Sequence, residues 1–173
     1  MNKNGYMIIE GVLSISIILI ITGLIYQLLF YNVKIKEDIE NNTELQQQAL
    51  ESISHIEKII QKSRGIINIK ECGSFENLNK VKAIKCRYKT EDSVGIKDKE
   101  ILYKSQYDKL FINNLSSGGG SLSGGYEIGD YITNLYIGIN ESRDMVKVKV
   151  ELEKNKYNYN IEKVINILNF EGD

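Results

Sequence analysis

The chain has 173 residues and a mass of 19.8 kDa, which suits one domain with an attachment and leaves no room for two full domains. Its 22 lysines and arginines nearly balance 23 acidic residues, so it lacks the strongly basic patch expected of a nucleic-acid-binding protein. Mean hydropathy is slightly negative at -0.25 although one segment is strongly apolar, so the rest of the chain must be hydrophilic.

The first predicted element is a membrane-spanning helix. Residues 12–31 are uncharged and mostly apolar, and residues 7–9 extend the run, which meets the requirement of about 20 apolar residues for a span. A cleaved secretory signal is the rival, but its apolar region is about 7–15 residues long and ends in a small-x-small site. The end of the apolar run, "GLIYQLLFYNVKIK", has no small-x-small cleavage site, so we expect the span to be retained. Lys3 and the terminal amine favour a cytoplasmic N-terminus, with the remainder outside the membrane.

Helical periodicity continues beyond Tyr31 without a break. Apolar residues recur at spacings of three and four, with Asn42 and Gln46 filling one gap: Ile35, Ile39, Ala49, Ile53, Ile56 and Ile60. No Pro or Gly interrupts residues 24–64, and Gly65 is placed as a helix stop. The pattern predicts one helix of about 55–60 residues, whose second half (32–64) carries an apolar stripe that covers another element.

From residue 66 the pattern changes to period two, which is typical of strands. The clearest run is 145–154, in which Val146, Val148, Val150 and Leu152 alternate with charged residues. Further strands are predicted within 84–88, 100–104, 109–113, 131–139 and 157–168, and "NESRD" is a predicted hairpin connection. In 131–139 the residues expected on one face are Tyr131, Thr133, Leu135, Ile137 and Ile139. We therefore predict an α+β fold, in which a long N-terminal helix packs on an antiparallel meander of four to six strands over 65–173.

A glycine-rich run, "SSGGGSLSGG", occupies residues 116–125. A phosphate-binding loop would need G-x-x-x-x-G-K-[ST], or G-x-G-x-x-G opening a helix, and neither is present. We therefore interpret the run as a flexible surface loop.

Cys72 and Cys86 enclose a loop in a segment expected to face outward, where disulfides persist. A disulfide between them and two free thiols both remain open, whereas a metal site would need more ligands. His55 is the only histidine and is predicted to be an ordinary helix-surface residue. No arrangement of residues indicates a catalytic triad or a carboxylate pair, so we expect neither an enzyme nor a cofactor or metal.

Glu10 is the unusual residue of the span, because a carboxylate near the start of a membrane helix is costly and usually has a partner and a function. A cut between Gly5 and Tyr6 would create an amine one helical turn before Glu10. The amine and the carboxylate could neutralise each other within one chain or between two packed chains. The second arrangement makes a polymer.

The segment "KNGYMIIEGVLSISIILIITGLIYQLL" resembles the class III signal of type IV prepilins and pseudopilins. That signal has a short basic leader ending in glycine, an aromatic first mature residue, glutamate at the fifth mature position and an unbroken apolar helix. Lys3 and Gly5 match the leader end, Tyr6 the first mature residue and Glu10 the assembly glutamate. The resemblance is close over residues 3–31 and only in outline beyond them.

The resemblance implies that a prepilin peptidase removes the leader (1–5) after Gly5 and N-methylates Tyr6. It also implies that Glu10 guides the mature helix (6–31) into a filament, with other pilins or pseudopilins, an inner-membrane assembly platform and membrane lipid as partners. Tyr6 stands where phenylalanine is usual, Met7 where threonine is frequent, and the family's mid-helix proline is absent, with Gly23 as a substitute source of looseness.

We expect a minor pilin or pseudopilin of a type IV pilus, with a major pilin, a competence pseudopilin and a protein-secretion pseudopilin as rivals. No direct binding of nucleic acid by the head is expected. The alternative from another class is a single-pass, membrane-anchored extracytoplasmic binding module that does not polymerise.

Overall fold

The computed structural model describes residues 3–75, 78–88, 97–116, 119–122 and 125–170, with the side chains of 3–5 and 71–75 left out. The chain divides into two compact units, Met1–Asn41 and Asn42–Asp173. We call the second unit the head. Each unit is described by itself.

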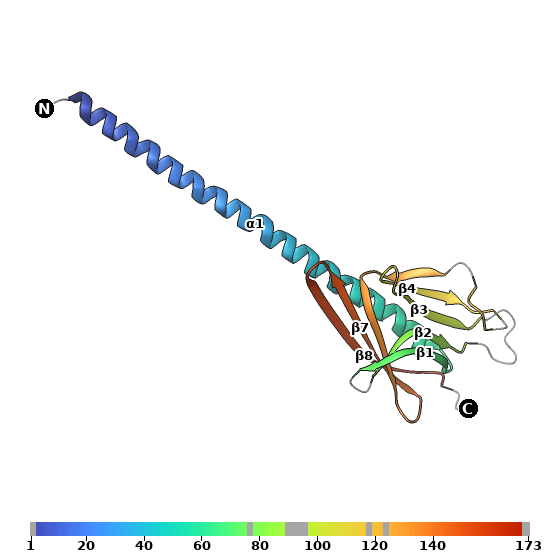
Figure 1. Ribbon diagram of the computed structural model, residues 1–173. Coiled ribbons are helices and arrows are strands. Elements are labelled where there is room, and N and C mark those ends of the chain that lie inside the picture. Colours follow the sequence, from blue (N-terminus) through green and yellow to red (C-terminus); the bar gives the residue numbers. More distant parts are fainter. Residues whose placement is uncertain (1–2, 76–77, 89–96, 117–118, 123–124, 171–173) are drawn as a thin grey trace. The chain divides into compact units, whose positions relative to one another are not determined.

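One helix, α1 (Lys3–Lys62), runs through 60 residues without a break, as the sequence predicted (Figure 1). It ends three residues before Gly65, whose φ of +147° is a conformation that glycine adopts at no steric cost. The buried hydroxyl and the amide of Ser63 both donate to the carbonyl of Ile60, at 2.7 and 3.1 Å, and so satisfy one of the free carbonyls at the helix end.

The head contains one antiparallel sheet of eight strands. The strands are β1 (Ile66–Phe75), β2 (Leu78–Cys86), β3 (Lys99–Lys104), β4 (Lys109–Asn114), β5 (Tyr126–Gly129), β6 (Ile132–Ile139), β7 (Met145–Lys154) and β8 (Tyr157–Asn166). Their order is β5-β4-β3-β2-β6-β7-β8, and β1 pairs with β2 off this path. β2 is the branch point, because residues 83–86 pair with β3 whereas residues 79–80 pair with β6.

The core of the head lies between the last five turns of α1 and one face of the sheet (Figure 1). Apolar side chains of the helix meet apolar side chains of β2, β3, β4, β6 and β7, all nearly inaccessible to water. The helix contributes Leu45, Ala49, Ile53, Ile56, Ile59 and Ile60. The α+β prediction, a long helix packed on an antiparallel sheet, is therefore confirmed.

The strand predictions hold best where alternation is strict. In β7, Val146, Val148, Val150 and Leu152 are all buried, and β7 pairs with β6 through the predicted turn at 140–144. The prediction of four to six strands was too low, because β1 and β5 were not anticipated as separate strands. β1 lacks regular alternation and its pairing with β2 shifts register at three places, while β5 has only four residues.

Two details of the predicted core were wrong. The apolar stripe of α1 begins at Leu45, which is fully buried, whereas Ile39 is 59% exposed and Asn42 and Gln46 face solvent. In β6 the predicted alternation starts one residue off: Tyr131 lies outside the strand at a φ of +61°, and Ile132 is buried. A register shift between Ile132 and Asn134 restores the predicted inward positions from Leu135 onward.

Candidate functional site on the N-terminal helix

The first two turns of α1 bring together three of the residues singled out in the sequence. Gly5, Tyr6 and Glu10 all lie within the helix, and Glu10 follows Tyr6 by four residues. Residues four apart lie on the same face one turn from each other, with about 5–6 Å between their Cβ atoms. Tyr6 is 76% exposed. Its backbone nitrogen and the Glu10 carboxylate therefore occupy one side of the helix start.

Gly5 lies in the first turn of α1 as it is described from Lys3 onward. Glycine weakens a helix by about 1 kcal/mol relative to alanine.

The apolar part of α1 is exposed on every side. Its most apolar 18-residue window has a mean hydropathy of 2.5 and none of it is buried within the chain. Large side chains on different sides of the helix, such as Leu13, Ile18 and Leu19, are each more than half exposed. The C-terminal part of α1 is covered by the sheet of the head, whereas this apolar part is not covered by any described element. Among the described residues, one helix is thus long and apolar enough to cross a membrane.

The serine and threonine hydroxyl groups of the apolar part of α1 bond to its own backbone. Ser14 donates to the carbonyl of Glu10 at 2.9 Å, Ser16 to that of Val12 at 2.8 Å, and Thr22 to that of Ile18 at 2.8 Å. Each bond reaches back four residues, so none of these hydroxyls carries an unsatisfied donor into an apolar environment.

Glu10 is the only charged residue between Lys3 and Lys34. Among the described side chains, no hydrogen bond or ion pair engages its carboxylate. A buried or lipid-facing carboxylate is stabilised by an amine at hydrogen-bonding distance. The arrangement is thus suited to receive a positively charged terminus, from its own chain or from a neighbour.

Gly11 and Gly23 lie in open space. A Cβ added to either would meet nothing within 4 Å, so no contact inside this chain requires a glycine there. The helix passes through Gly23 without interruption.

The two cysteines are not brought together by the sheet. The neighbours of Cys72 in β1, Glu71 and Gly73, pair with Val81 and Lys80, whereas Cys86 pairs with Ile66. Five residues of β2 separate these positions, roughly 16 Å at about 3.3 Å per residue, and a disulfide needs Cα atoms within about 7 Å. The side chain of Cys72 lies outside the described residues. A Cys72–Cys86 disulfide, one of the two possibilities that the sequence left open, would require a different register.

Cys86 is a free thiol buried in the head. Burial, and then the nearby charge of Asp98, raise the pKa of the Cys86 thiol to about 12. The thiol therefore stays protonated at neutral pH, which makes it a poor nucleophile and a poor metal ligand.

His55 and the glycine-rich run occupy places close to those predicted. His55 is half-buried on α1 and its ring meets that of Tyr126 edge to face, with centroids 6.4 Å apart. The described residues of 116–125 form a hydrogen-bonded turn, in which the amide of Ser116 donates to the carbonyl of Gly120 and Lys85 Nζ donates to that of Gly119. Residues 117–118 and 123–124 lie outside the described part, so flexibility of the whole run stays a prediction.

Comparison of the chain with protein-family models, with curated proteins and with solved structures found no match.

Proposed function

We propose that this chain is a structural subunit of a bacterial type IV pilus or a related pseudopilus, inserted through α1, cleaved after Gly5 and assembled through Glu10. One observation carries the proposal. A carboxylate lies one helical turn beyond a glycine–aromatic junction, at the start of a helix whose apolar surface is exposed on every side. The likeness of residues 3–31 to prepilin signals adds to this observation.

The physical reason is the free energy of a charge in hydrocarbon. A carboxylate costs about 2.5–3.5 kcal/mol at the centre of a span and less toward its end. Cleavage before Tyr6 would supply a compensating amine. Within one chain the amine and carboxylate are held by the helix, but between chains the same pair offsets the cost and also fixes how two helices align. Exposed apolar side chains on both helices then pack together.

The proposal assigns a location and a set of partners. The N-terminus lies in the cytoplasm, α1 crosses the cytoplasmic membrane, and the head lies outside until assembly carries it to the cell surface. Partners are a prepilin peptidase, which also methylates Tyr6, other pilins or pseudopilins, an inner-membrane assembly platform and lipid. The irregular head favours a minor subunit, and the near balance of charge gives no reason to expect direct nucleic-acid binding by the head.

The second candidate is a single-pass anchored binding module that does not polymerise. The observation that favours it is a cavity of about 820 Å³ in the head, within the size range of small-molecule sites. The two candidates differ in what happens at Gly5–Tyr6, because an anchor has no need of cleavage there.

The deciding experiment is the intact mass of the full chain from membranes of cells with and without a prepilin peptidase. We expect a chain that begins at Tyr6 and carries one added methyl group when the peptidase is present, and a chain that retains residues 1–5 when it is absent. A chain that keeps the leader in the presence of the active peptidase contradicts the proposal and supports the anchored module.

A pair of glycine variants makes the mass measurement specific. Gly5→Val places a branched side chain at the proposed cleavage junction and should leave the leader attached. Gly11→Val makes the same change one residue beyond Glu10, where an added side chain meets nothing within this chain, and should be processed normally. Equal processing of both variants would show that Gly5 is not the recognition residue.

A further inference from the structure

Strand β8 is a long and regular edge of the sheet. The strand order of the head ends at β8, which pairs with β7 alone among the described strands (Figure 1). Its ten residues follow β7 without a register shift. The edge strand β5 has only four residues, and β1 is interrupted by three register shifts. Short or bulged edges resist pairing with another chain, whereas a long regular edge favours it.

The hairpin between β7 and β8 determines which backbone groups face outward. The two strands are joined by a two-residue turn, in which Asn155 has a φ of +56°. A turn of this kind closes on a hydrogen-bonded pair, here Lys154 with Tyr157. Because hydrogen-bonded and non-hydrogen-bonded pairs alternate along an antiparallel ladder, every second residue of β8 turns its N–H and C=O away from β7.

The outward backbone groups belong to Asn158, Asn160, Glu162 and Val164. No hydrogen bond from any other described residue reaches the backbone of these four. The charges that could protect the edge are bound within the head: Glu162 pairs with Lys147 at 2.8 Å, and Lys163 pairs with Glu57 at 2.7 Å. The edge thus presents a row of unpaired donors and acceptors beside side chains whose charges are already balanced.

We infer that β8 pairs antiparallel with β8 of a second copy of this chain, with Ile161 opposite Ile161 across a two-fold axis. The outward backbone groups must face each other and each side chain must stay on its own face of the sheet, so even-numbered residues pair with even-numbered ones. The two such registers with the longest overlap place either Ile161 or Glu162 opposite its own copy. The second register sets two carboxylates against each other, which is unfavourable, and the first does not.

The inferred register also gives each charged residue of β8 a suitable neighbour. Asn160 lies opposite Glu162 of the second copy, where its amide can donate to the carboxylate. Lys163 lies opposite Tyr159, an arrangement in which an ammonium group can lie over an aromatic ring. Tyr159 and Ile161 are only partly buried at the margin of the core in a single head, so pairing removes more of their apolar surface from water.

The direction of β8 determines which copies can pair. Lys154, just before β8, contacts Glu44 at 2.5 Å, and Lys163, within β8, contacts Glu57 at 2.7 Å. β8 therefore runs in the same direction as the last five turns of α1, and the two-fold axis sets these turns of the two heads antiparallel. Helices inserted side by side in one membrane run the same way. The pair thus joins copies that face each other, as where two filaments or two membranes meet.

The inference goes beyond the proposed function, because the edge pairs whether or not the chain polymerises. The test is oxidative cross-linking of the full chain in detergent solution, in a Cys72→Ser background that keeps the buried thiol of Cys86. Ile161→Cys places two thiols across the axis, where the Cα atoms of a non-hydrogen-bonded pair are about 4.5 Å apart, within the range of a disulfide.

We expect disulfide-linked dimers of Ile161→Cys to form at least about tenfold faster than those of Lys58→Cys, which places an exposed thiol on α1 outside the edge. The Lys58→Cys rate measures random collision between chains and association of the spans in the micelle. An Ile161→Cys rate no higher than that of Lys58→Cys overturns the inference.

A mixing experiment tests the register. Glu162→Cys and Asn160→Cys should each cross-link slowly alone, because identical residues at these positions lie two residues apart along the ladder. An equimolar mixture should give mixed dimers, identified by mass, faster than either variant gives its own. Faster dimer formation by Glu162→Cys alone than by Ile161→Cys contradicts the assigned register.

A proline variant tests the backbone bonds without introduced thiols. Asn160→Pro removes an outward N–H and leaves the bonds to β7 in place. Two symmetric hydrogen bonds are lost, so the dissociation constant of the dimer, measured by sedimentation in density-matched detergent, should rise about tenfold or more. Asn160→Ala keeps the N–H and should have a smaller effect. Equal dimer affinity of the wild type and Asn160→Pro, with unchanged thermal unfolding, overturns the inference.

Discussion

The two ends of α1 place the same kinds of side chain in opposite surroundings. Leu19 is 67% exposed, whereas Leu45, on the same continuous helix, is fully buried in the head. Around Leu19 apolar residues occupy every side of the helix, while around Leu45 they form one stripe with polar residues elsewhere. A stripe needs one partner surface, which the sheet provides. A helix that is apolar on every side needs an apolar environment around it, because exposure of that surface to water is unfavourable.

The comparison separates two roles that hydrophobic residues have in this chain. In the head, apolar burial stabilises a fold that is complete within one molecule. In the span, apolar exposure contributes nothing to the fold of the single chain and becomes favourable only in lipid or against other helices. Substitutions should therefore affect stability in one region and location or assembly in the other.

The largest expected effect is on assembly, at Glu10. We expect Glu10→Ala to insert in membranes normally, because a charge has been removed from an apolar segment, and to fall about tenfold or more in sheared filaments, because the pairing of terminus and carboxylate is lost. Immunoblots of sheared and membrane fractions measure both quantities.

Glu40→Ala is the matched control for that experiment, since Glu40 lies exposed on the same helix, where it pairs with Lys36 at 3.5 Å. It should enter filaments like the wild type. Normal entry of Glu10→Ala would show that Glu10 is not the assembly contact.

The next effect is on stability, and it tests the comparison directly. Leu45→Ala should lower the free energy of unfolding of the head by about 2–5 kcal/mol, because it removes a fully buried side chain and leaves a cavity. Leu19→Ala makes the same chemical change on the exposed span and should leave unfolding of the head unchanged. Thermal unfolding of the full chain in detergent, followed by far-ultraviolet circular dichroism, measures both. Equal effects would contradict the division of roles.

A smaller loss of stability is expected at Gly129, where β5 comes very close to α1. A Cβ built on Gly129 would lie 2.0 Å from Ser52 Oγ and 3.2 Å from Ser52 Cβ, and that hydroxyl now donates to the carbonyl of Ile128 at 3.3 Å. Gly129→Ala should therefore cost about 1–3 kcal/mol, measured by denaturant unfolding. The cost should shrink in a Ser52→Ala background, and an undiminished cost there would point away from this contact. Gly23→Ala, in open space on the span, is the control.

The smallest effect concerns pH. Hydrogen bonds from Lys154 and then from Tyr131 hold the pKa of Glu44 below its ordinary value of 4.5. The folded head thus binds this proton less readily than the unfolded chain, so the contribution to stability is complete above pH 4.5 and is lost as the pH falls through the lower folded-state pKa. The difference in Tm between neutral and acidic buffer should therefore be smaller for Glu44→Gln than for the wild type. Glu153→Gln, exposed on β7, should behave like the wild type.

Sequence periodicity was sufficient for the helix and for the regular strands, because each depends on local patterning. β7 alternates strictly, and each predicted inward residue is buried. β1 was missed since its residues "NIKECGSF" follow no period and its pairing with β2 is irregular. Tyr131 was misplaced because a left-handed backbone at a bulky residue has no local signal. It is held there by tertiary contacts, including a hydrogen bond from its hydroxyl to Glu44 Oε1 at 3.0 Å.

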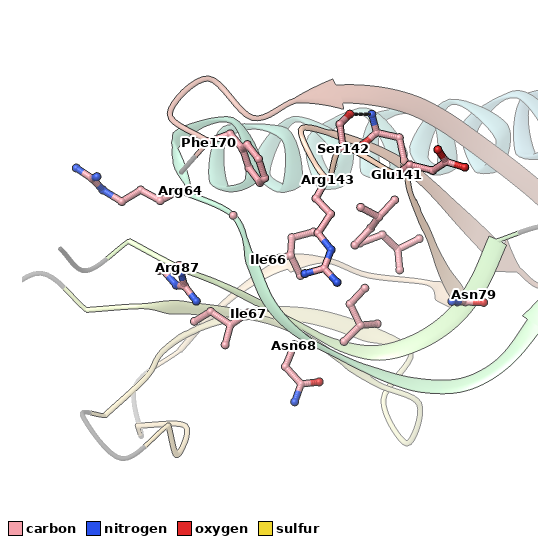
Figure 2. Close-up of a pocket in the computed structure, with 15 residues that line it drawn as sticks. Arg64, Ile66, Ile67, Asn68, Asn79, Arg87, Glu141, Ser142, Arg143 and Phe170 are labelled. Atoms are coloured by element: carbon pink, nitrogen blue, oxygen red, sulfur yellow. Dashed lines mark hydrogen bonds between the residues drawn. The ribbon is translucent and has the colours of Figure 1, made fainter. Parts of the chain in front are cut away.

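The two candidate sites differ in the same way. Gly5, Tyr6 and Glu10 lie within two helical turns, so their spacing in the sequence already gives their spacing in space. The cavity of about 820 Å³ in the head joins segments near residues 64, 87 and 143, which only the sheet and its hairpin bring together (Figure 2). No local pattern in the sequence indicates that these segments meet.

The back-bonded hydroxyls of Ser14, Ser16 and Thr22 have a consequence for how such helices can slide. With those groups occupied by their own carbonyls, the helix surface has no charged group between Glu10 and Lys34, and its serine and threonine hydroxyls are already bonded. Two such helices could shift along each other with little change in the energy of their apolar contacts. Only the pairing of one acidic group with a positive charge would favour a particular position. The axial offset between neighbouring helices would then be fixed by this one charge pair.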